Sequence, residues 1–373
     1  MVHTNMQVTT PPSAICYVAG KSGGHILPAL TLARHYKQQN PQAQVLFFST
    51  DCAMDKSLIA DQEVVDHYVP LSLGDVPYKK ILAYPRYIWD ACASFFTSLR
   101  HLRKHRPQSV ISTGGYIAIP VCLAAKLLGI PITIFELNVV PGKATLWLAP
   151  LAHKLLICFE QTATHLPKYT CTLTPYPLRY SEQDKHGNQL TALAEMGFSP
   201  HKKTILLLGG SQGSVFLNKL LHNWLEQVPQ LHSTLQIVHQ TGSYDTTDWK
   251  SLYTAFGIPA IVFDYCDNLQ PYYTVADLII SRAGAGTLFE TAFFGTCCIT
   301  IPLETATTAH QTDNAQAMAQ QYPGQFIVIR QDDVINNPHV VYNTICHHLI
   351  SSGQPHALKT TTQCPKNLNN NIL

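Results

Sequence analysis

A glycine-rich loop between a buried strand and a helix constrains the fold of this chain most strongly. An apolar run at residues 15–19 leads into residues 20–25 (Gly-Lys-Ser-Gly-Gly-His), and an apolar-periodic segment follows at 27–36. This order is typical of a parallel α/β sheet, where glycines let the backbone approach a ligand and a helix N-terminus offers unpaired N–H donors to an anion. A single loop of this kind is equally consistent with an ordinary tight turn that exposes a histidine.

The same arrangement occurs three more times. Glycine-rich segments follow predicted strands at residues 112–116 (Ser-Thr-Gly-Gly-Tyr), 209–213 (Gly-Gly-Ser-Gln-Gly) and 281–287 (Ser-Arg-Ala-Gly-Ala-Gly-Thr). Four such junctions predict a parallel α/β architecture with ligands at the carboxyl ends of the strands. None of the four has P-loop spacing, and none is followed by the acidic residue of a dinucleotide fingerprint.

Strands and helices alternate in two blocks. We expect strands at 15–19, 44–48, 64–69, 109–111, 132–135, 154–158 and 171–174, and then at 204–208, 235–239, 260–263, 278–280, 297–301 and 326–329. Pro175 and Pro177 end the first block, and the polar residues 181–189 are typical of a linker. A chain of 373 residues is long enough for two domains. We predict α/β domains at 13–178 and 179–350, and a disordered tail at 351–373.

Composition excludes several classes of protein. The formal net charge of +2 provides no field for a nucleic-acid partner. The 18 histidines show no metal-ligand spacing and the 11 cysteines contain no CxxC motif, so we expect no metal, no tightly bound cofactor and reduced thiols in the cytoplasm. We also expect neither a signal peptide nor a membrane-spanning helix, which needs roughly 18 apolar residues.

The second block has the better candidate nucleotide site. Backbone N–H groups of residues 209–213 suit a diphosphate, and Glu290, one helical turn after Gly286, can accept both ribose hydroxyls. Gln311 and Asn314 lie one turn apart at the start of another helix and can read sugar hydroxyls. The alternatives are that Glu290 is a solvated helix residue and that Gln311 and Asn314 only cap their helix.

Seven motifs in this order resemble the MurG family of peptidoglycan N-acetylglucosaminyltransferases, in glycosyltransferase family 28. They are GKSGGHILPALTLA, STGGYIAIP, LGIPITIFELNVVPGKAT, Pro177-Leu178-Arg179, LLLGGSQGSVFLN, SRAGAGTLFE and HQTDNA. The resemblance implies a GT-B fold, with two Rossmann-like parallel-sheet domains facing a deep cleft. It implies inverting transfer of GlcNAc from UDP-GlcNAc to the 4-hydroxyl of MurNAc in undecaprenyl-pyrophosphoryl-MurNAc-pentapeptide (lipid I), giving lipid II. It also implies a peripheral enzyme on the cytoplasmic face of the bacterial inner membrane, with other cell-wall synthesis and division proteins as partners.

The resemblance also assigns site residues, position by position. Contacts to UDP-GlcNAc are implied for Ser22, Gly23, Gly24, Asn138, Arg179, Ser211, Gln212, Cys266, Ala285, Gly286, Thr287, Leu288, Phe289, Glu290 and Gln311. Contacts to the acceptor diphosphate are implied for Gly23, Gly24, Gly114, Gly115 and Tyr116. The chain departs from the family pattern at Lys21, which replaces a small residue, at Leu137, which replaces glutamine, and at Pro175-Tyr176, which replaces Gly-Asn and is expected to stiffen the hinge.

The reaction needs a deprotonated acceptor hydroxyl and a stabilised leaving diphosphate. Residues 264–267 (Asp-Tyr-Cys-Asp) lack the spacing of a DxD metal motif, so loop N–H groups and helix dipoles are expected to stabilise the leaving group. His25 is the candidate general base because a histidine titrates near neutral pH, and Glu136 is the second candidate.

A basic and aromatic segment at residues 77–106 predicts a membrane-docking face. Basic residues beside aromatic ones are typical of interfacial segments. The predicted face comprises Lys79, Lys80, Ile81, Leu82, Tyr84, Arg86 and Trp89, an anionic membrane surface is the expected partner, and residues 95–102 are expected in the core. The alternative is a long core helix whose C-terminal cations favour its dipole.

Other functions stay open at this point. One is another GT-B enzyme, either a lipid glycosyltransferase or a UDP-GlcNAc epimerase, although a soluble epimerase would not need the basic and aromatic segment. The other is a non-catalytic, membrane-bound scaffold for cell-wall enzymes, against which the intact His25, Glu290 and Gln311 argue.

Overall fold

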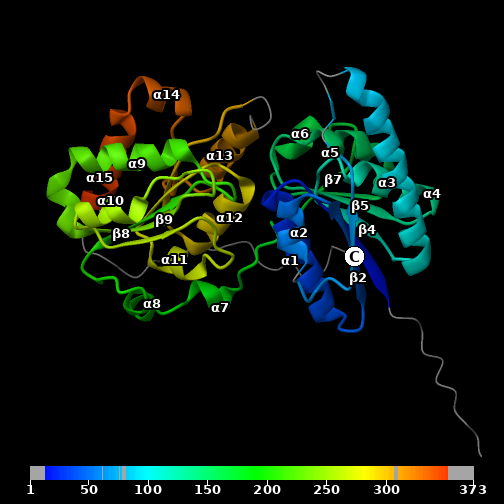
Figure 1. Ribbon diagram of the computed structural model, residues 1–373, viewed down its shortest axis with the longest axis horizontal. Coiled ribbons are helices and arrows are strands. Elements are labelled where there is room, and N and C mark those ends of the chain that lie inside the picture. Colours follow the sequence, from blue (N-terminus) through cyan, green and yellow to red (C-terminus); the bar gives the residue numbers. More distant parts are fainter. Residues whose placement is uncertain (1–12, 61, 75, 78–80, 306–309, 352–373) are drawn as a thin grey trace, which may run out of the picture. The chain divides into compact units, whose positions relative to one another are not determined.

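The computed structural model describes residues 13–351, except 61, 75, 78–80 and 306–309. The chain divides into two compact units, and each is a parallel sheet with helices packed on it (Figure 1). The first unit comprises Met1–Leu137, Pro141–Cys158 and Leu166–Leu173, and the second comprises Asn138–Val140, Phe159–His165 and Thr174–Leu373. The domain boundary after residue 178 stays a prediction, and the expected tail at 351–373 lies, beyond its first residue, outside the described residues.

The first unit contains a seven-stranded parallel sheet in the order β3-β2-β1-β4-β5-β6-β7. Its strands are β1 (Ala14–Val18), β2 (Gln44–Thr50), β3 (His67–Leu71), β4 (Val110–Ser112), β5 (Ile132–Glu136), β6 (Lys154–Ile157) and β7 (Cys171–Leu173). Its helices are α1 (Gly23–Gln39), α2 (Ala53–Ile59), α3 (Tyr84–His105), α4 (Ala118–Leu127) and α5 (Lys143–Leu148), with 3-10 turns at Ile81–Ala83 and Ala149–Leu151. The strand order reverses between β1 and β4, which is where doubly wound sheets place ligands.

The second unit contains a six-stranded parallel sheet in the order β10-β9-β8-β11-β12-β13. Its strands are β8 (Lys203–Leu208), β9 (Leu235–Gln240), β10 (Ala260–Phe263), β11 (Leu278–Ser281), β12 (Cys297–Thr300) and β13 (Phe326–Val328). Its helices are α6 (Thr162–His165), α7 (Glu182–Lys185), α8 (Gln189–Glu195), α9 (Val215–Gln227), α10 (Trp249–Ala255), α11 (Gln270–Val275), α12 (Ala285–Phe294), α13 (His310–Gln321), α14 (Gln331–Asn336) and α15 (His339–Ser351), with a 3-10 turn at Pro229–Thr234. Here the order reverses between β8 and β11.

These sheets confirm the predicted α/β class, and each predicted strand has a counterpart. The third strand was predicted at 64–69 and is observed at His67–Leu71. The preceding Asp66 still bonds to β2, since its N–H donates to the Val45 carbonyl oxygen at 3.1 Å, while its carboxylate accepts from the Lys37 ammonium at 2.8 Å and the Val45 N–H at 2.7 Å. The polar residues 181–189, predicted as a linker, contain α7, which the Ser181 and Asp184 capping box begins.

Both sheets are buried on their two faces. All residues of β1 and β11 are buried, as expected for parallel strands with helices on both sides. The cysteines within the described ranges are free thiols. Among the described helices, none is both long enough and apolar enough to cross a bilayer.

Candidate active site

The switch point of the first unit brings two predicted glycine loops together. β1 and β4 pair side by side, with Val18 opposite Ser112, so the loops that follow them share one edge of the sheet. Gly115 has a φ of +90°, and a Cβ there would lie 3.1 Å from the carbonyl oxygen of Gly20. The positive φ and the close approach of the two backbones therefore favour glycine at position 115.

His25 lies half-buried in the first turn of α1, beside the loop that follows β4. Its Nδ1 is 2.7 Å from the carbonyl oxygen of Thr113, and the Thr113 hydroxyl donates to the carbonyl oxygen of His25 at 2.8 Å. A carbonyl only accepts, so Nδ1 carries the hydrogen and Nε2 of the neutral ring keeps its lone pair. A Cβ on Gly114, whose φ is +121°, would lie 2.7 Å from the His25 ring. Glycine at 114 therefore makes room for the base candidate.

A buried aspartate that the sequence analysis missed holds the first loop. Lys21 has a φ of 65°, a left-handed conformation that is uncommon outside glycine. Its N–H donates to both carboxylate oxygens of Asp55, at 3.1 and 3.0 Å, and Thr50 donates to the same group from its N–H and its hydroxyl. The family departure at Lys21 is thus accommodated by its backbone. The first turn of α1 carries no acidic residue, which leaves its N-terminus suited to an anion.

Glu136, the second base candidate, acts within the first unit as a structural acceptor. It is buried at the end of β5, and its Oε2 accepts from the Gly142 N–H at 3.0 Å and the Thr145 hydroxyl at 2.6 Å. These bonds fix the start of α5 relative to β5. Leu137, the second departure from the family pattern, is buried beside it. The geometry favours His25 over Glu136 as the base, because His25 is half-exposed and keeps an accepting nitrogen.

In the second unit, the glycine loop after β8 lies against the loop after β9. Gly213 has a φ of +75° and Gly242 a φ of +81°, and a Cβ on either residue would overlap the backbone of the other loop. Only glycine allows this contact. Ser211 and Gln212, two predicted donor contacts, are exposed at the tip of the loop. The tip of the loop is therefore exposed to solvent, while the contact between Gly213 and Gly242 fixes the position of its backbone.

The structure pairs two predicted donor residues, Arg179 and Glu290. The guanidinium donates from Nε to Oε1 at 2.8 Å and from Nη2 to Oε2 at 3.3 Å, and the Tyr273 hydroxyl donates to Oε2 at 3.0 Å. Burial is the largest single influence on the pKa of Arg179 and lowers it, but the charge and hydrogen bond of Glu290, together with Tyr180 and Tyr273, raise the pKa overall. Glu290 is buried, so the alternative of a solvated helix residue is wrong. Tyr273 was not predicted.

The glycine segment at residues 281–287 leads into α12 and is supported by an unpredicted aromatic cluster. The Phe289 ring stacks on Tyr176 with centroids 4.7 Å apart, and it lies 4.9 Å from the Phe159 ring. A Cβ on Gly286 would lie 3.2 Å from the Tyr176 hydroxyl. The family departure at Tyr176 therefore packs directly on the predicted donor segment. Within that segment, the side chains of Ala285 and Leu288 are buried and that of Thr287 is half-buried.

Asn314 and Gln311 differ in role, although both lie in the first turns of α13. Asn314 is fully buried, where its Oδ1 accepts from the Val139 N–H at 2.8 Å and its Nδ2 donates to Asn138 Oδ1 at 3.0 Å. It therefore fixes Asn138, a predicted donor contact, and cannot read sugar hydroxyls as expected. Gln311 is half-buried and accepts from the Leu303 N–H at 3.0 Å. Cys266 is half-buried after β10, with its thiol 3.2 Å from the carbonyl oxygen of Asn268.

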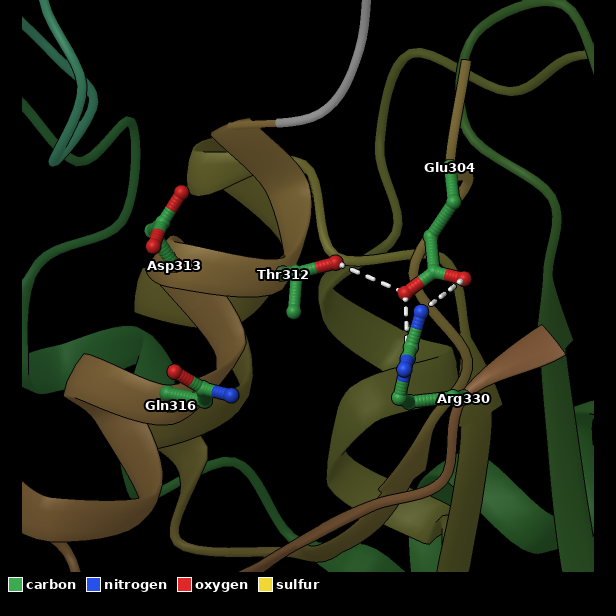
Figure 2. Close-up of a pocket in the computed structure, with 5 residues that line it drawn as sticks. All are labelled: Glu304, Thr312, Asp313, Gln316 and Arg330. Carbon is green, nitrogen blue, oxygen red and sulfur yellow. Dashed lines mark hydrogen bonds and ion pairs between the residues drawn. The ribbon is translucent and has the colours of Figure 1, made fainter. Parts of the chain in front are cut away.

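A polar hollow of about 420 Å³ lies beside α13 (Figure 2). It is lined by Glu304, Thr312, Asp313, Gln316 and Arg330. Thr312 points from the helix toward Glu304, which accepts from its hydroxyl at 3.2 Å and from Arg330 Nε at 2.9 Å (Figure 2). None of the predicted site residues lines this hollow. Across the described residues, no group of three or more His, Cys, Asp or Glu side chains is arranged to hold a metal ion.

The predicted membrane face is described only in part. Lys79 and Lys80 lie outside the described residues, and Ile81 is described as backbone within a 3-10 turn. Leu82 and Trp89 are 97% and 75% exposed, Arg86 is exposed and Tyr84 is half-buried. Residues 95–102 were expected in the core, but Phe96 is 65% exposed, and within that stretch only Ser98 and Leu102 are fully buried. The exposed apolar side of α3 is thus longer than predicted.

Comparisons with known proteins match both units. The glycosyltransferase family 28 N-terminal domain matches residues 15–157, and the family 28 C-terminal domain matches residues 204–354. A UDP-N-acetylglucosamine–N-acetylmuramyl-(pentapeptide) pyrophosphoryl-undecaprenol N-acetylglucosamine transferase of Protochlamydia amoebophila is 33% identical, over 84% of this chain and 82% of its own. The enzyme of the same name from Thermotoga is 32% identical, over 86% of this chain and 88% of its own. The crystal structure of Acinetobacter baumannii MurG matches with a TM-score of 0.66 at 28% identity, over 91% of each chain.

Proposed function

Since the chain belongs to glycosyltransferase family 28, we propose that it transfers GlcNAc from UDP-GlcNAc to the 4-hydroxyl of MurNAc in lipid I, which gives lipid II. The observation that carries this proposal is that the family matches span the glycine loops of both units, at residues 15–157 and 204–354, and that such transferases are more than 30% identical to most of the chain. A chain that kept the fold alone would not be expected to keep a histidine with an accepting nitrogen on an anion-binding loop.

The first unit supplies the chemistry on the acceptor. The MurNAc 4-hydroxyl attacks the anomeric carbon of GlcNAc on the face opposite UDP, and its proton passes to His25 Nε2. The bond from the anomeric carbon to the β-phosphate oxygen breaks, and its electron pair leaves with UDP. The imidazolium that forms is stabilised by the Thr113 carbonyl, which accepts from Nδ1–H. Gly23, Gly24, Gly114, Gly115 and Tyr116 are the proposed contacts to the acceptor diphosphate.

The second unit binds the donor. The tip of the loop at 209–213 and the N-terminus of α12 supply N–H donors to the diphosphate, which carries more charge as it leaves. Each carboxylate oxygen has two lone-pair directions. Oε2 of Glu290 accepts from Arg179 Nη2 and Tyr273, and Oε1 accepts from Arg179 Nε, so one direction on Oε1 remains for a ribose hydroxyl while these partners stay bound. The pKa of Tyr273 is raised, first by burial and then by the Glu290 charge, which keeps its hydroxyl a donor.

One assay tests the reaction and separates the alternatives. The full chain is incubated with UDP-GlcNAc and a short-chain lipid I analogue, and disaccharide and UDP are measured together. Equal amounts of both support the proposal. Isomerised UDP-sugar without an acceptor would indicate an epimerase, transfer to diacylglycerol but not to lipid I would indicate another lipid glycosyltransferase, and binding without turnover would indicate a scaffold.

We also propose that the chain docks peripherally on anionic membrane through the start of α3, as a lipid-linked acceptor requires. Leu82 and Trp89 are exposed apolar side chains beside Arg86, and each cation near an anionic surface contributes on the order of 1 kcal/mol. Changing Lys79, Lys80 and Arg86 to Glu should abolish salt-sensitive binding to anionic vesicles, while turnover of a soluble acceptor persists.

Vesicle co-sedimentation with a matched apolar control completes this test. Trp89→Glu should weaken binding, whereas Leu190→Glu, at a position in the second unit that is 62% exposed, should leave it unchanged. Sedimentation that ignores lipid charge and these changes would exclude this segment as the docking face.

A further inference from the structure

Arg282 is a buried arginine at the carboxyl end of β11 whose partners are all neutral. It is 6% exposed. Its Nε donates to the Ser214 hydroxyl at 3.1 Å, its Nη1 lies 3.1 Å from the carbonyl oxygen of Ile301 and 3.4 Å from that of Pro302, and its guanidinium lies 5.2 Å from the Phe216 ring centroid. One side chain thus connects the segments that follow β8, β11 and β12.

The charge of Arg282 is uncompensated within the described part of the protein. No carboxylate there bonds to it, and burial lowers its pKa to about 10. A buried charge without a counter-ion is costly and buried charges are generally paired, so an anionic ligand would supply the opposite charge that Arg282 needs. Arg179 in the same unit shows the contrast, because Glu290 binds it with two hydrogen bonds.

Arg282 lies close to the N-termini of α9 and α12 in the second unit. β8 and β11 are neighbours, with Leu208 opposite Ser281, and the Arg282 N–H donates to the Leu208 carbonyl oxygen at 3.2 Å. α9 follows Ser214 and α12 follows Gly284, and neither helix has an acidic residue in its first turn. In the described part of the chain, Nη2 of Arg282 has no acceptor, although Nε and Nη1 are fixed. Two helix N-termini and one guanidinium therefore favour a single anion at this edge.

We propose that Arg282 is a further donor-site residue, whose Nη2 donates to a phosphate oxygen of the bound nucleoside diphosphate. The hydrogen bonds to the Ser214 hydroxyl and the Ile301 carbonyl oxygen fix the orientation of the guanidinium. The positive charge is therefore in place before the ligand binds. The role rests on the proposed function, since it takes the donor to be a UDP-sugar. It adds a fixed positive charge to the N–H groups that stabilise the leaving UDP.

Calorimetric titration of the full chain with UDP, UMP and uridine tests the proposal. R282M should weaken UDP binding by at least about 10-fold, the scale of a lost charged hydrogen bond, and leave uridine binding unchanged. R330M removes an exposed arginine of the same unit that already pairs with Glu304, and it should leave UDP binding unchanged. Thermal unfolding of each variant checks the fold.

Two further variants keep the test decisive if R282M does not fold. R282K keeps the charge and should bind UDP within a few-fold of the unmodified chain, whereas R282Q keeps hydrogen-bond donors without the charge and should not. Equal loss for uridine and UDP, or no loss for either, would overturn the role of Arg282. If the unmodified chain binds no UDP at all, the donor assignment itself fails, which is a separate result.

Discussion

Each unit has a histidine next to its glycine loop, and the two side chains are held in opposite ways. His25 is half-buried and uses one ring nitrogen on the Thr113 carbonyl. His239, at the end of β9, is fully buried and uses both, since Nε2 lies 3.0 Å from Asn218 Oδ1 and Nδ1 lies 2.8 Å from the Tyr253 hydroxyl. Residue type is shared, but His25 lies in the first turn of α1 and His239 within β9, and their hydrogen-bond partners decide which histidine is available for chemistry.

The buried histidine belongs to a network that holds the donor loop. Asn218 also donates to the Thr241 carbonyl oxygen at 3.0 Å and to the Asp245 carboxylate at 2.8 Å. Thr241 precedes Gly242, whose backbone meets Gly213. In the first unit the loop therefore leads directly to the proposed base, whereas in the second the side chains lie beneath the loop and fix its backbone.

The largest expected effect is that of His25→Ala. Loss of a general base should lower kcat by about 100-fold or more, with UDP affinity nearly unchanged. Turnover of UDP-GlcNAc and a lipid I analogue gives kcat, and calorimetry gives the UDP affinity. His201→Gln, at an exposed position of the second unit, is the control and should retain full activity. Turnover within a few-fold of normal after His25→Ala would transfer the role to Glu136.

Gly213→Ala should show that the second loop depends on its backbone. The new methyl group would overlap the Thr241 and Gly242 backbone at a positive φ, so we expect about 2–4 kcal/mol less stability and loss of UDP binding. Gly210 has a φ of +85° but open space around its Cβ position, so Gly210→Ala should cost only about 1 kcal/mol. Equal effects in denaturant unfolding would mean that conformation alone, without the contact to Gly242, determines the loss.

Glu290→Ala should weaken binding of the donor nucleotide and leave general-base catalysis by His25 unaffected. Loss of a charged acceptor typically costs about 1.5–3 kcal/mol, so UDP affinity should fall roughly 10- to 100-fold. Glu304→Ala is the control, since it removes another arginine-paired carboxylate of the same unit that lies outside the proposed site. Unchanged UDP affinity by calorimetry for Glu290→Ala would remove this residue from the donor site.

The sequence predicts the sheets well because buried parallel strands are continuous apolar runs. The one clear shift is β3, an edge strand that is only partly buried and whose pattern is weaker. The glycine loops can also be recognised from the sequence, because positions where two backbones come close are occupied by glycine. Phe96 shows the limit, because an apolar side chain in a helix gives no sign of whether it faces the core or the solvent.

The residues that sequence reasoning missed act through contacts distant in the chain. Asp55 bonds to a loop 34 residues before it, and Tyr273 bonds to a carboxylate 17 residues after it. Arg282 stands inside a recognised glycine motif, but the lack of a counter-ion among the described residues becomes visible only when its three neutral partners are placed around it. Contacts of this kind depend on the tertiary fold, and the spacing of residues along the sequence does not predict them.

The smallest expected effect concerns pH and the buried histidine. Burial is the main cause that lowers the pKa of His239 to about 3, against 6.5 for an exposed histidine. Between those values the His239 side chain binds more protons in the unfolded chain than in the folded one, so its contribution to the free energy of unfolding should fall as the pH drops below about 6.5, approaching 1.4 kcal/mol per pH unit. His239→Gln removes this one proton from the balance and should flatten the slope by that amount, whereas His201→Gln, at an exposed position, should not. Urea unfolding at several pH values between 7.5 and 5 measures the slope, in a Trp89→Phe, Trp147→Phe background where Trp224 and Trp249 of the second unit report. An unchanged slope in His239→Gln would mean that His239 can be protonated inside the fold, and the two histidines would then differ less than their hydrogen bonds indicate.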